Sequence, residues 1–321
     1  LLLSVMLVLS LAACGGGKDA KDDSADGDLS GKEIIIGNIT PVTGAQAAYG
    51  LAITNSIQMA IDEINADGGI LGATVKLSTK DDQGTPAEAV SGFNSLLSEG
   101  AAAIIGATLS SCTSAITSLA DDEGIVLVTP SSTADSITTT DDYVFRSCFK
   151  DSFQGEMVAA YAKDQGWTKA AVLYATGDTY SSGLHDSFVK AAEKYGIEIV
   201  CEQSSSDTGA VDFSSQLATI AASGADMLFA PYYYDAVGPK IIPQAREAGF
   251  KGAIIGCDGF DGTQDYTTGD LSAYENVYFT NHYSPEDSSE IVQSYVKNYT
   301  EKYGSESMNA LGALAYDAMY M

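Results

Sequence analysis

Residues 34–50 have the sequence IIIGNITPVTGAQAAYG, and the change of pattern within this stretch decides the fold. The first six residues, IIIGNI, form an apolar run that predicts a short buried strand. A helical spacing follows, with isoleucines on one stripe at Ile53, Ile57, Ile61 and Ile64. This spacing predicts a helix over 50–67. A strand followed by an amphipathic helix is the first unit of an α/β fold.

The same alternation continues along the chain. Apolar runs predict further strands at 73–80, 102–106, 125–129, 170–175, 197–203, 226–231, 253–256 and 277–281. Amphipathic stretches predict helices that open at the capping box Thr85-Pro86-Ala87-Glu88 and then span 111–122, 153–165, 182–195, 212–223, 235–249, 287–303 and 307–321. Alternating strands and helices predict parallel sheets that are covered on both faces.

Two such sets predict an α/β protein with two Rossmann-like lobes joined by a multi-strand hinge. We place the N-terminal lobe at 33–150 plus 282–321 and the C-terminal lobe at 151–281. The chain stops inside a helical pattern, so we expect a C-terminal segment beyond Met321.

The first residues of the chain do not fit a folded domain. Residues 1–13, LLLSVMLVLSLAA, are almost wholly apolar but too short to span a bilayer, as in the central region of a signal peptide. No basic residue or initiator Met precedes them, so we expect this signal to be incomplete. Small residues before Cys14 resemble the lipobox of bacterial lipoproteins, which predicts a lipid on Cys14 and a signal segment at 1–14; an ordinary secretory signal is the alternative. Residues 15–32 contain almost no apolar side chains and predict a flexible tether.

The composition argues against several functional classes. There are 43 acidic and 16 basic residues, a net charge of −27, and such a surface repels nucleic acids. With two histidines and no CxxC pair, we expect no metal site. No phosphate loop, GxSxG elbow or HExxH motif is present, so we expect neither an enzyme nor a cofactor. Cys112 and Cys148 are candidates for a disulfide in an exported protein, with the pairing left open.

Candidate binding residues follow the strands, because ligands of open parallel sheets lie beyond the carboxyl ends of the strands. In the first lobe, Ser110 and Ser111 begin a helix whose free N–H groups can bind a carboxylate. Plain N-capping by serine is the alternative. Ser131 and Thr133 follow the next strand and can add hydroxyl and carbonyl contacts, or form only a turn.

The second lobe offers an acid in the corresponding place. Asp258 directly follows a strand and can pair with an ammonium group; alternatively, it holds its own turn beside Gly259. Tyr49, Tyr180 and Tyr233 can form the walls, although such tyrosines also serve as packing residues. A carboxylate site in one lobe and an ammonium site in the other predict an α-amino acid held between two closing lobes.

Several segments together resemble a known family. They are IGNITPVTGAQAAYG, MAIDEINADGGILG, KDDQGTPAEAV, DEGIVLVTPSSTA, VFRSCFKDSFQG, IIPQAREAGFKG and GCDGFD. These segments are similar to those of the type I periplasmic solute-binding proteins for branched-chain amino acids. The resemblance runs from about residue 33 to the end of the chain. It implies the type I fold and a monomeric, extracytoplasmic, lipid-anchored subunit that delivers an amino acid to the permease of an ABC importer.

The resemblance also implies roles for individual residues. Ser110 would bind the ligand carboxylate with Thr133, aided by backbone at Ser131. Tyr49, Tyr180 and Tyr233 would line the pocket, and Asp258 would receive the ammonium group where many members have Glu.

Two other functions are compatible with the same fold. One is binding of an amide, urea or an aromatic carboxylate, ligands that lack an ammonium group for Asp258. The other is an extracellular sensor domain that passes closure to a signalling partner.

Overall fold

The computed structural model describes residues 28–139 and 142–321. The signal segment, Cys14 and most of the expected tether lie outside these residues. At the end of the tether, Leu29 N donates to Leu71 O at 2.8 Å and Thr74 N donates to Lys32 O at 3.0 Å. Residues 28–32 are therefore already bonded to the first lobe.

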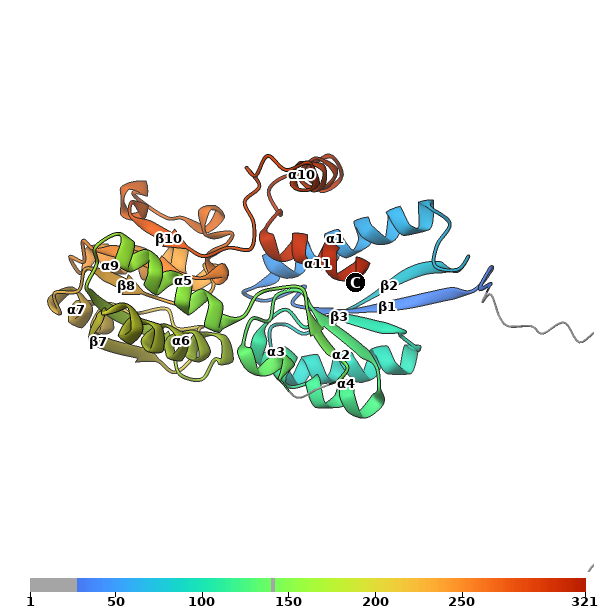
Figure 1. The fold of residues 1–321 in the computed structure, drawn as a ribbon, viewed down its shortest axis with the longest axis horizontal. Coiled ribbons are helices and arrows are strands. Elements are labelled where there is room, and N and C mark those ends of the chain that lie inside the picture. Colours follow the sequence, from blue (N-terminus) through green and yellow to red (C-terminus); the bar gives the residue numbers. More distant parts are fainter. Residues whose placement is uncertain (1–27, 140–141) are drawn as a thin grey trace, which may run out of the picture.

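The first lobe is built on a sheet of five strands in the order β2-β1-β3-β4-β5, all parallel. The strands are β1 (Glu33–Thr40), β2 (Thr74–Asp81), β3 (Ala103–Gly106), β4 (Val126–Thr129) and β5 (Val144–Arg146). Its helices are α1 (Ala47–Ala66), α2 (Pro86–Glu99), α3 (Ser110–Ser114) and α4 (Thr117–Glu123). In Figure 1, α1 lies on one face of this sheet, and α2, α3 and α4 lie on the other.

The second lobe repeats this plan with the sheet order β10-β9-β8-β6-β7, again all parallel. The strands are β6 (Lys169–Ala175), β7 (Glu198–Ser205), β8 (Met227–Phe229), β9 (Ala253–Gly256) and β10 (Val277–Phe279). The helices are α5 (Asp151–Asp164), α6 (Thr179–Tyr195), α7 (Ser214–Ala222), α8 (Tyr234–Ala236) and α9 (Ile242–Glu247). Val172 packs in the core on the α5–α6 side of the sheet and Leu173 in the core on the α7–α9 side, as the alternation of a strand requires.

The last two helices, α10 (Glu290–Tyr303) and α11 (Ala310–Tyr320), return to the first lobe and pack against α1 (Figure 1). Ser56 Oγ and Tyr295 Oη lie 2.9 Å apart between α1 and α10. A Cβ at Gly312 would lie only 3.0 Å from Ala52 O, so the glycine permits the close contact of α11 with α1. The chain thus crosses between the lobes near residues 147–150 and again near 280–284.

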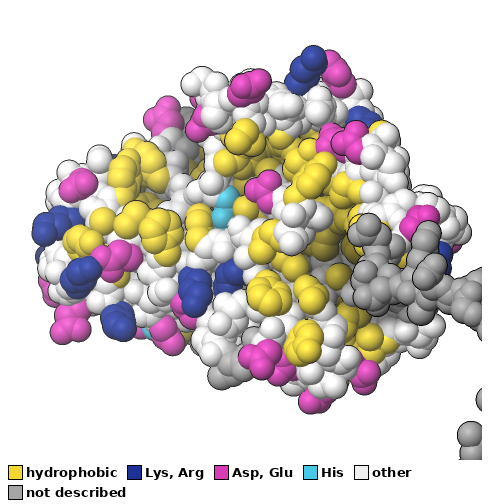
Figure 2. All heavy atoms as spheres, turned by 45° about the vertical axis from the view of Figure 1, so that its right-hand side comes forward, with side chains coloured by type: hydrophobic (Ala, Val, Ile, Leu, Met, Phe, Trp, Pro, Cys, Tyr) yellow, Lys and Arg dark blue, Asp and Glu magenta, His cyan; other side chains and the backbone are white. Residues whose placement is uncertain are grey.

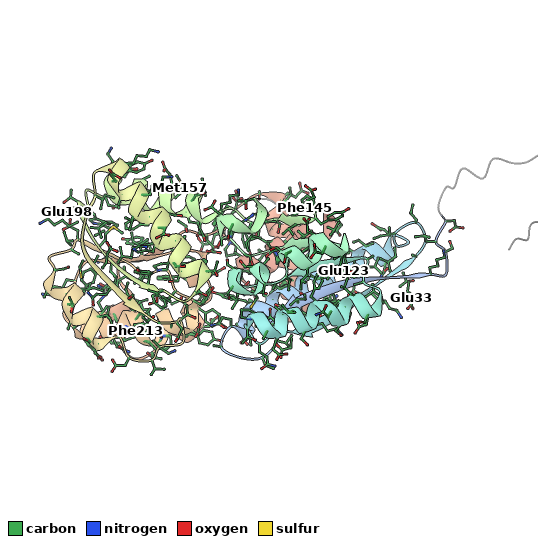
Figure 3. All side chains as sticks on the ribbon, turned by 90° about the horizontal axis from the view of Figure 1, so that it is seen from below. Glu33, Glu123, Phe145, Met157, Glu198 and Phe213 are labelled. Atoms are coloured by element: carbon green, nitrogen blue, oxygen red, sulfur yellow. The ribbon has the colours of Figure 1, made fainter. Side chains whose placement is uncertain are left out.

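The two sheets point their carboxyl ends at each other. In Figure 3, Glu33 at the start of β1 and Glu198 at the start of β7 lie at opposite outer ends of the molecule. In each sheet, successive strands are added first on one side of the starting strand and then on the other. The change of side, the topological switch point, lies between β1 and β3 in the first sheet and between β6 and β8 in the second. Ligands of open α/β sheets bind at such switch points. Because the carboxyl ends of the two sheets point at each other, both switch points face one central space.

The alternation of strands and helices is confirmed, with three local differences. The predicted helix 111–122 is two helices, because Ala115 N and Ile116 N donate to the third carbonyl back and close α3 after five residues. The predicted helix 235–249 contains a π-helical turn at Val237–Ile241, where Pro239 has no N–H to donate. The strand β5 was not predicted, since three residues carry no detectable periodicity.

Two further findings concern the described residues only. Cys112, Cys148, Cys201 and Cys257 are free thiols, so the candidate disulfide between Cys112 and Cys148 is absent. None of the described helices is long and apolar enough to cross a lipid bilayer.

Candidate ligand-binding site

A small cavity, with a volume of about 10 Å³, lies where the carboxyl ends of the two sheets meet. Its walls come from the segments that follow β3, β4, β8 and β9 and from the first turns of α1, α3, α6 and α11. The lining residues are Tyr49, Thr108, Leu109, Ser110, Ser131, Tyr180, Tyr233, Asp258, Gly259 and Leu311. The structure therefore brings six of the eight predicted site residues to one cavity; Ser111 and Thr133 lie beside the lining residues in sequence but outside the lining itself.

At the first-lobe end, the helix start of α3 faces the cavity. The N-cap position is Leu109, which makes no side-chain cap, so the serines at 110 and 111 are inside the first turn and do not serve as caps. Ser110 is 2% exposed, and its Oγ accepts only a long hydrogen bond of 3.4 Å from Ala134 N. Because the first N–H groups of a helix have no intrahelical acceptor, this end offers donors to an anion.

The loop after β4 adds a second set of polar groups. Ser131 Oγ donates to Thr108 O at 2.8 Å, which ties this loop to the loop after β3. Thr133 is fully buried, and its Oγ1 makes no hydrogen bond of normal geometry with the described residues, although the hydroxyl lies beside the Asp151 carboxyl and partly offsets the rise in its pKa. Its carbonyl accepts from Asp151 N at 2.9 Å. A buried hydroxyl without a well-formed hydrogen bond costs free energy, and a ligand group within reach removes that cost.

The second-lobe end is centred on Asp258, which is 3% exposed in a 3₁₀ turn directly after β9. Its Oδ1 accepts from Tyr180 Oη at 2.9 Å and from Gln154 Nε2 at 2.8 Å. Its Oδ2 lies 3.3 Å from His282 Nε2. Asp258 is therefore held by three side chains from α5, α6 and the second crossing segment, and it does more than stabilise its own turn.

A glycine completes this arrangement. Gly259 N donates to Tyr180 Oη at 2.8 Å, so the tyrosine hydroxyl accepts from the backbone while it donates to the acid. A Cβ at Gly259 would lie 2.8 Å from Tyr180 Oη and 2.8 Å from Tyr232 O, a spacing that only glycine tolerates. Gly259 is thus a site residue because of its missing side chain.

The second-lobe end of the cavity is buried and rich in acidic side chains. Burial raises the pKa of the Asp151 carboxyl well above its usual range, and the neighbouring Asp258 charge raises it further. Burial likewise raises the pKa of the Tyr180 hydroxyl, with the Asp258 charge as the next cause. These shifts indicate that a cationic group placed beside Asp258 is favoured, because it relieves the repulsion between the buried acids.

The walls between the two ends are aromatic and aliphatic. Tyr180 and Tyr233 stack with ring centroids 5.0 Å apart, and Tyr49 meets Tyr233 edge-on at 6.5 Å. Tyr49 Oη crosses the gap between the lobes and donates to Gly259 O at 2.6 Å. Leu109 and Leu311 supply the apolar remainder, 5% and 4% exposed.

Sequence reasoning missed several of these residues. Thr108, Leu109 and Gly259 are neighbours of predicted residues and follow strands, so the same rule applied more widely would find them. His282 directly follows the predicted strand 277–281, so the same rule would find it as well. Leu311 and Gln154 lie inside helices, and no local pattern marks them.

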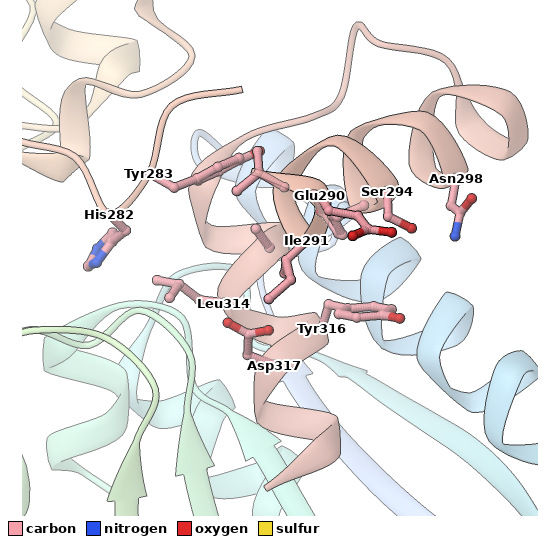
Figure 4. A pocket seen from close by; sticks show the side chains of 12 residues that line it. His282, Tyr283, Glu290, Ile291, Ser294, Asn298, Leu314, Tyr316 and Asp317 are labelled. Carbon is pink, nitrogen blue, oxygen red and sulfur yellow. The ribbon is translucent and has the colours of Figure 1, made fainter. Parts of the chain in front are cut away.

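A larger hollow lies elsewhere, between α10, α11 and the second crossing segment (Figure 4). Figure 2 shows hydrophobic side chains gathered on this face, and Ile291 there is 82% exposed. Aliphatic and tyrosine side chains dominate its walls, and it lies away from the carboxyl ends of the strands. We therefore assign ligand binding to the smaller cavity. Over the same described ranges, no cluster of three or more His, Cys, Asp or Glu side chains is arranged to hold a metal ion.

Comparisons with known proteins identify the family. Residues 33–321 match a family model described as periplasmic binding protein. A Leu/Ile/Val-binding protein homolog of Brucella melitensis is 32% identical over 251 residues, which cover 78% of this chain and 67% of the relative. The crystal structure of the leucine-binding protein LivK of Thermotoga maritima has a TM-score of 0.82 at 32% identity, covering 89% of this chain and 81% of that one. The branched-chain amino acid substrate-binding protein LivJ of Streptococcus pneumoniae, in complex with isoleucine, has a TM-score of 0.81 at 32% identity, covering 90% and 82%. The chain therefore belongs to the periplasmic binding protein family.

Proposed function

We propose that this protein captures an aliphatic amino acid between its two lobes and delivers it to the permease of an ABC importer. The relatives that carry Leu/Ile/Val-binding names and the isoleucine complex of a 32% identical structure support this assignment. The cavity itself supports it independently, because its two polar ends have opposite preferences. The single observation that carries the proposal is the buried carboxylate of Asp258 opposite the α3 helix start, across one small cavity.

The proposed role of each group follows from the hydrogen-bond donors and acceptors that it still has free for a ligand. At the first-lobe end, Ser110 and the free N–H groups at Ser110 and Ser111 bind the ligand carboxylate. Thr133 Oγ1, which makes no hydrogen bond of normal geometry with the described residues, binds the ligand, and the Ser131 backbone assists.

At the second-lobe end, Asp258 Oδ2 accepts the ammonium group, because Oδ1 already accepts two hydrogen bonds. Tyr49, Tyr180, Tyr233, Leu109 and Leu311 enclose the side chain. An aromatic carboxylate or an amide would leave Asp258 buried without a cation, which disfavours the alternative ligands.

The proposal also covers the location, membrane anchor, oligomeric state and lobe boundaries of the protein. Membership of the family implies an extracytoplasmic location. We propose a lipid anchor at Cys14, a monomeric state, and lobes divided at residues 150 and 281, with 282–321 returning to the first lobe. We further propose that the protein has no catalytic activity, since the cavity holds no nucleophile beside a general base and the ligand is released unchanged.

Titration calorimetry with the twenty amino acids, an aromatic carboxylate and urea tests this function. We expect leucine, isoleucine or valine to bind most tightly and the ligands without an ammonium group to bind weakly or not at all. Tight binding of benzoate or urea with no amino acid bound would overturn the assignment. Recovery of the unchanged amino acid after incubation tests the absence of catalysis.

A further inference from the structure

We propose that His282 is a positioning residue that shares Asp258 with the ligand's ammonium group, so that a protonated His282 weakens amino-acid capture. The inference rests on the proposed function, since it needs an ammonium group at Asp258. It starts from one contact. His282 Nε2 lies 3.3 Å from Asp258 Oδ2, and both side chains are 4% exposed.

The lone pairs of Asp258 explain why the two cations compete. An ionised carboxylate offers about four acceptor sites, two on each oxygen. Tyr180 and Gln154 already donate to Oδ1, so this oxygen is filled. An ammonium group must therefore bind Oδ2, the oxygen that faces His282.

The protonation state of His282 then decides how well the ligand is held. A neutral imidazole with its proton on Nε2 donates one hydrogen bond to Oδ2 and leaves the negative charge for the ammonium group. An imidazolium neutralises that charge itself and places two cations at one oxygen in a buried site. As a class, histidine side chains change charge between about pH 5 and 8, so a test in this range can compare the two states.

Other ionisable groups surround this pair, and most of them are acids. Asp258, Asp151 and Asp261 lie on the second-lobe side, where they act on one another. Cys148 and Arg146 lie on the first crossing, with the thiol close to both Asp151 and Asp258. Tyr283, Glu290 and Asp317 line, together with His282, the hollow of Figure 4. No Lys or Arg is among the residues that line this hollow.

His282 also connects the two crossings of the hinge. Its ring stacks on Phe149 of the first crossing, with centroids 3.7 Å apart and planes at 22°. In Figure 4 the His282 ring and the Tyr283 ring point in opposite directions. Nearby, Thr280 Oγ1 donates to Gln154 Oε1 at 2.6 Å, and Gln154 in turn holds Asp258. The hinge therefore positions His282 and Gln154 on the acid together.

The experiment is a calorimetric titration of L-leucine from pH 5.5 to 8.0 with the wild-type protein and His282→Gln. The glutamine amide can still donate to Asp258 but carries no charge. We expect the wild-type Kd to rise towards acid pH, by up to about tenfold per pH unit where proton and ammonium exclude each other. We expect the Kd of His282→Gln to depend much less on pH. This result would distinguish an effect of His282 from an effect of protonating Asp151 or Asp258.

The chain offers a matched control in its other histidine. His185 pairs with Asp186 at 2.8 Å and Glu202 at 2.9 Å and stacks on Tyr174 between α6 and the sheet, and it does not line the cavity. His185→Gln should keep the wild-type slope. Equal slopes in the wild type and His282→Gln, or a slope lost in His185→Gln, would overturn the inference while leaving the proposed function intact. No leucine binding at any pH would overturn both.

Proton counting gives a second measurement that needs no variant. Titrating leucine into the wild-type protein at pH 6 in two buffers of different ionisation enthalpy reports the protons exchanged. We expect release of a fraction of one proton on binding. Zero release or net uptake would contradict the competition.

Discussion

Gln46 Nε2 donates to Asp235 Oδ1 at 2.9 Å, although 189 residues separate the two. Gln46 precedes α1 in the first lobe, and Asp235 follows β8 in the second. Beside this pair, Tyr234 Oη donates to Ala45 O at 2.8 Å and accepts from Ala48 N at 3.2 Å. These bonds, the latch, join the lobes directly and do not involve the cavity lining except through the neighbouring Tyr49 and Tyr233.

The latch should stabilise the closed form without touching the ligand. A ligand that binds between two lobes gains affinity from every contact that favours closure. One hydrogen bond contributes about 0.5–1.5 kcal/mol, so Gln46→Ala should raise the Kd for leucine by about 3- to 10-fold. Calorimetry measures this directly.

The control for the latch is Gln58→Ala. Gln58 Nε2 donates to Asp62 Oδ1 at 2.7 Å within α1, so it is a glutamine–aspartate pair of the same kind inside one helix. Its loss should leave the Kd unchanged. Equal affinity in Gln46→Ala and the wild type would mean that the latch does not contribute to closure.

Thr133→Val should weaken ligand binding while having little effect on the free energy of unfolding. In the protein without ligand, Thr133 Oγ1 makes no hydrogen bond of normal geometry but lies beside the Asp151 carboxyl, so an isosteric methyl should change the free energy of unfolding by no more than about 1 kcal/mol. With ligand, the lost hydrogen bond should raise the Kd by about 3- to 10-fold. Urea unfolding and calorimetry on the same variant check both.

Thr113→Val is the matched variant for the stability half of that prediction. Thr113 Oγ1 donates to Ala107 O at 2.9 Å in the core, so its loss should lower the free energy of unfolding. If Thr133→Val destabilised the protein as much as Thr113→Val, the Thr133 hydroxyl would have a structural partner rather than a ligand.

Asp82 should make the protein less stable as the pH rises. Burial raises the pKa of this carboxyl from its ordinary 3.8 to about 6, and the neighbouring Asp81 charge adds to the shift. Between these pH values the folded protein binds more protons than the unfolded chain, so the free energy of unfolding falls as the pH rises from 4 to 6. At about 1.4 kcal/mol per pKa unit, the loss approaches about 3 kcal/mol.

Asp82→Asn should remove this loss, because the amide oxygen can still accept from Gly84 N, which now donates to Asp82 Oδ1 at 2.9 Å. Urea unfolding at pH 4.5, 6 and 7.5 measures the change. Asp81 is the internal control. Burial opposes its ionisation, but the Thr43 hydroxyl and backbone N–H groups lower its pKa, so Asp81→Asn should lose stability at neutral pH. A pH slope in Asp82→Asn equal to that of the wild type would contradict the prediction.

The sequence predicted most of the fold because the fold is encoded in local repeats. The stripe at Ile53, Ile57 and Ile61 is indeed buried against the first sheet. The Thr85 side chain accepts from Glu88 N at 3.4 Å, so the capping-box threonine does begin α2. On the other hand, Leu96 rather than Leu97 is fully buried in α2, since a spacing of three or four residues leaves the edge of the stripe open.

The candidate site was less accessible to the sequence. The rule that ligands lie beyond the carboxyl ends of parallel strands leads to Tyr49, Ser110 and Asp258. It applies because the carboxyl ends of parallel strands meet at one edge of a sheet, whatever the side-chain packing. The rule extends to His282, which follows β10 and contacts Asp258. It cannot find Gln154, which lies inside α5 and contacts Asp258 across 104 residues of sequence. Such a contact depends on tertiary packing, and nothing in a local pattern encodes that.

The central claim is that one zwitterion is held at both charged ends, and leucine analogues that lack one charge test it most directly. Calorimetry with 4-methylpentanoate, which lacks the ammonium group, should show at least about a 30-fold weaker affinity than leucine in the wild-type protein, because a buried Asp258 loses its cation. In Asp258→Asn, leucine itself should weaken until the two ligands bind alike. If 4-methylpentanoate bound the wild-type protein as tightly as leucine, Asp258 would not receive an ammonium group and the account would be wrong.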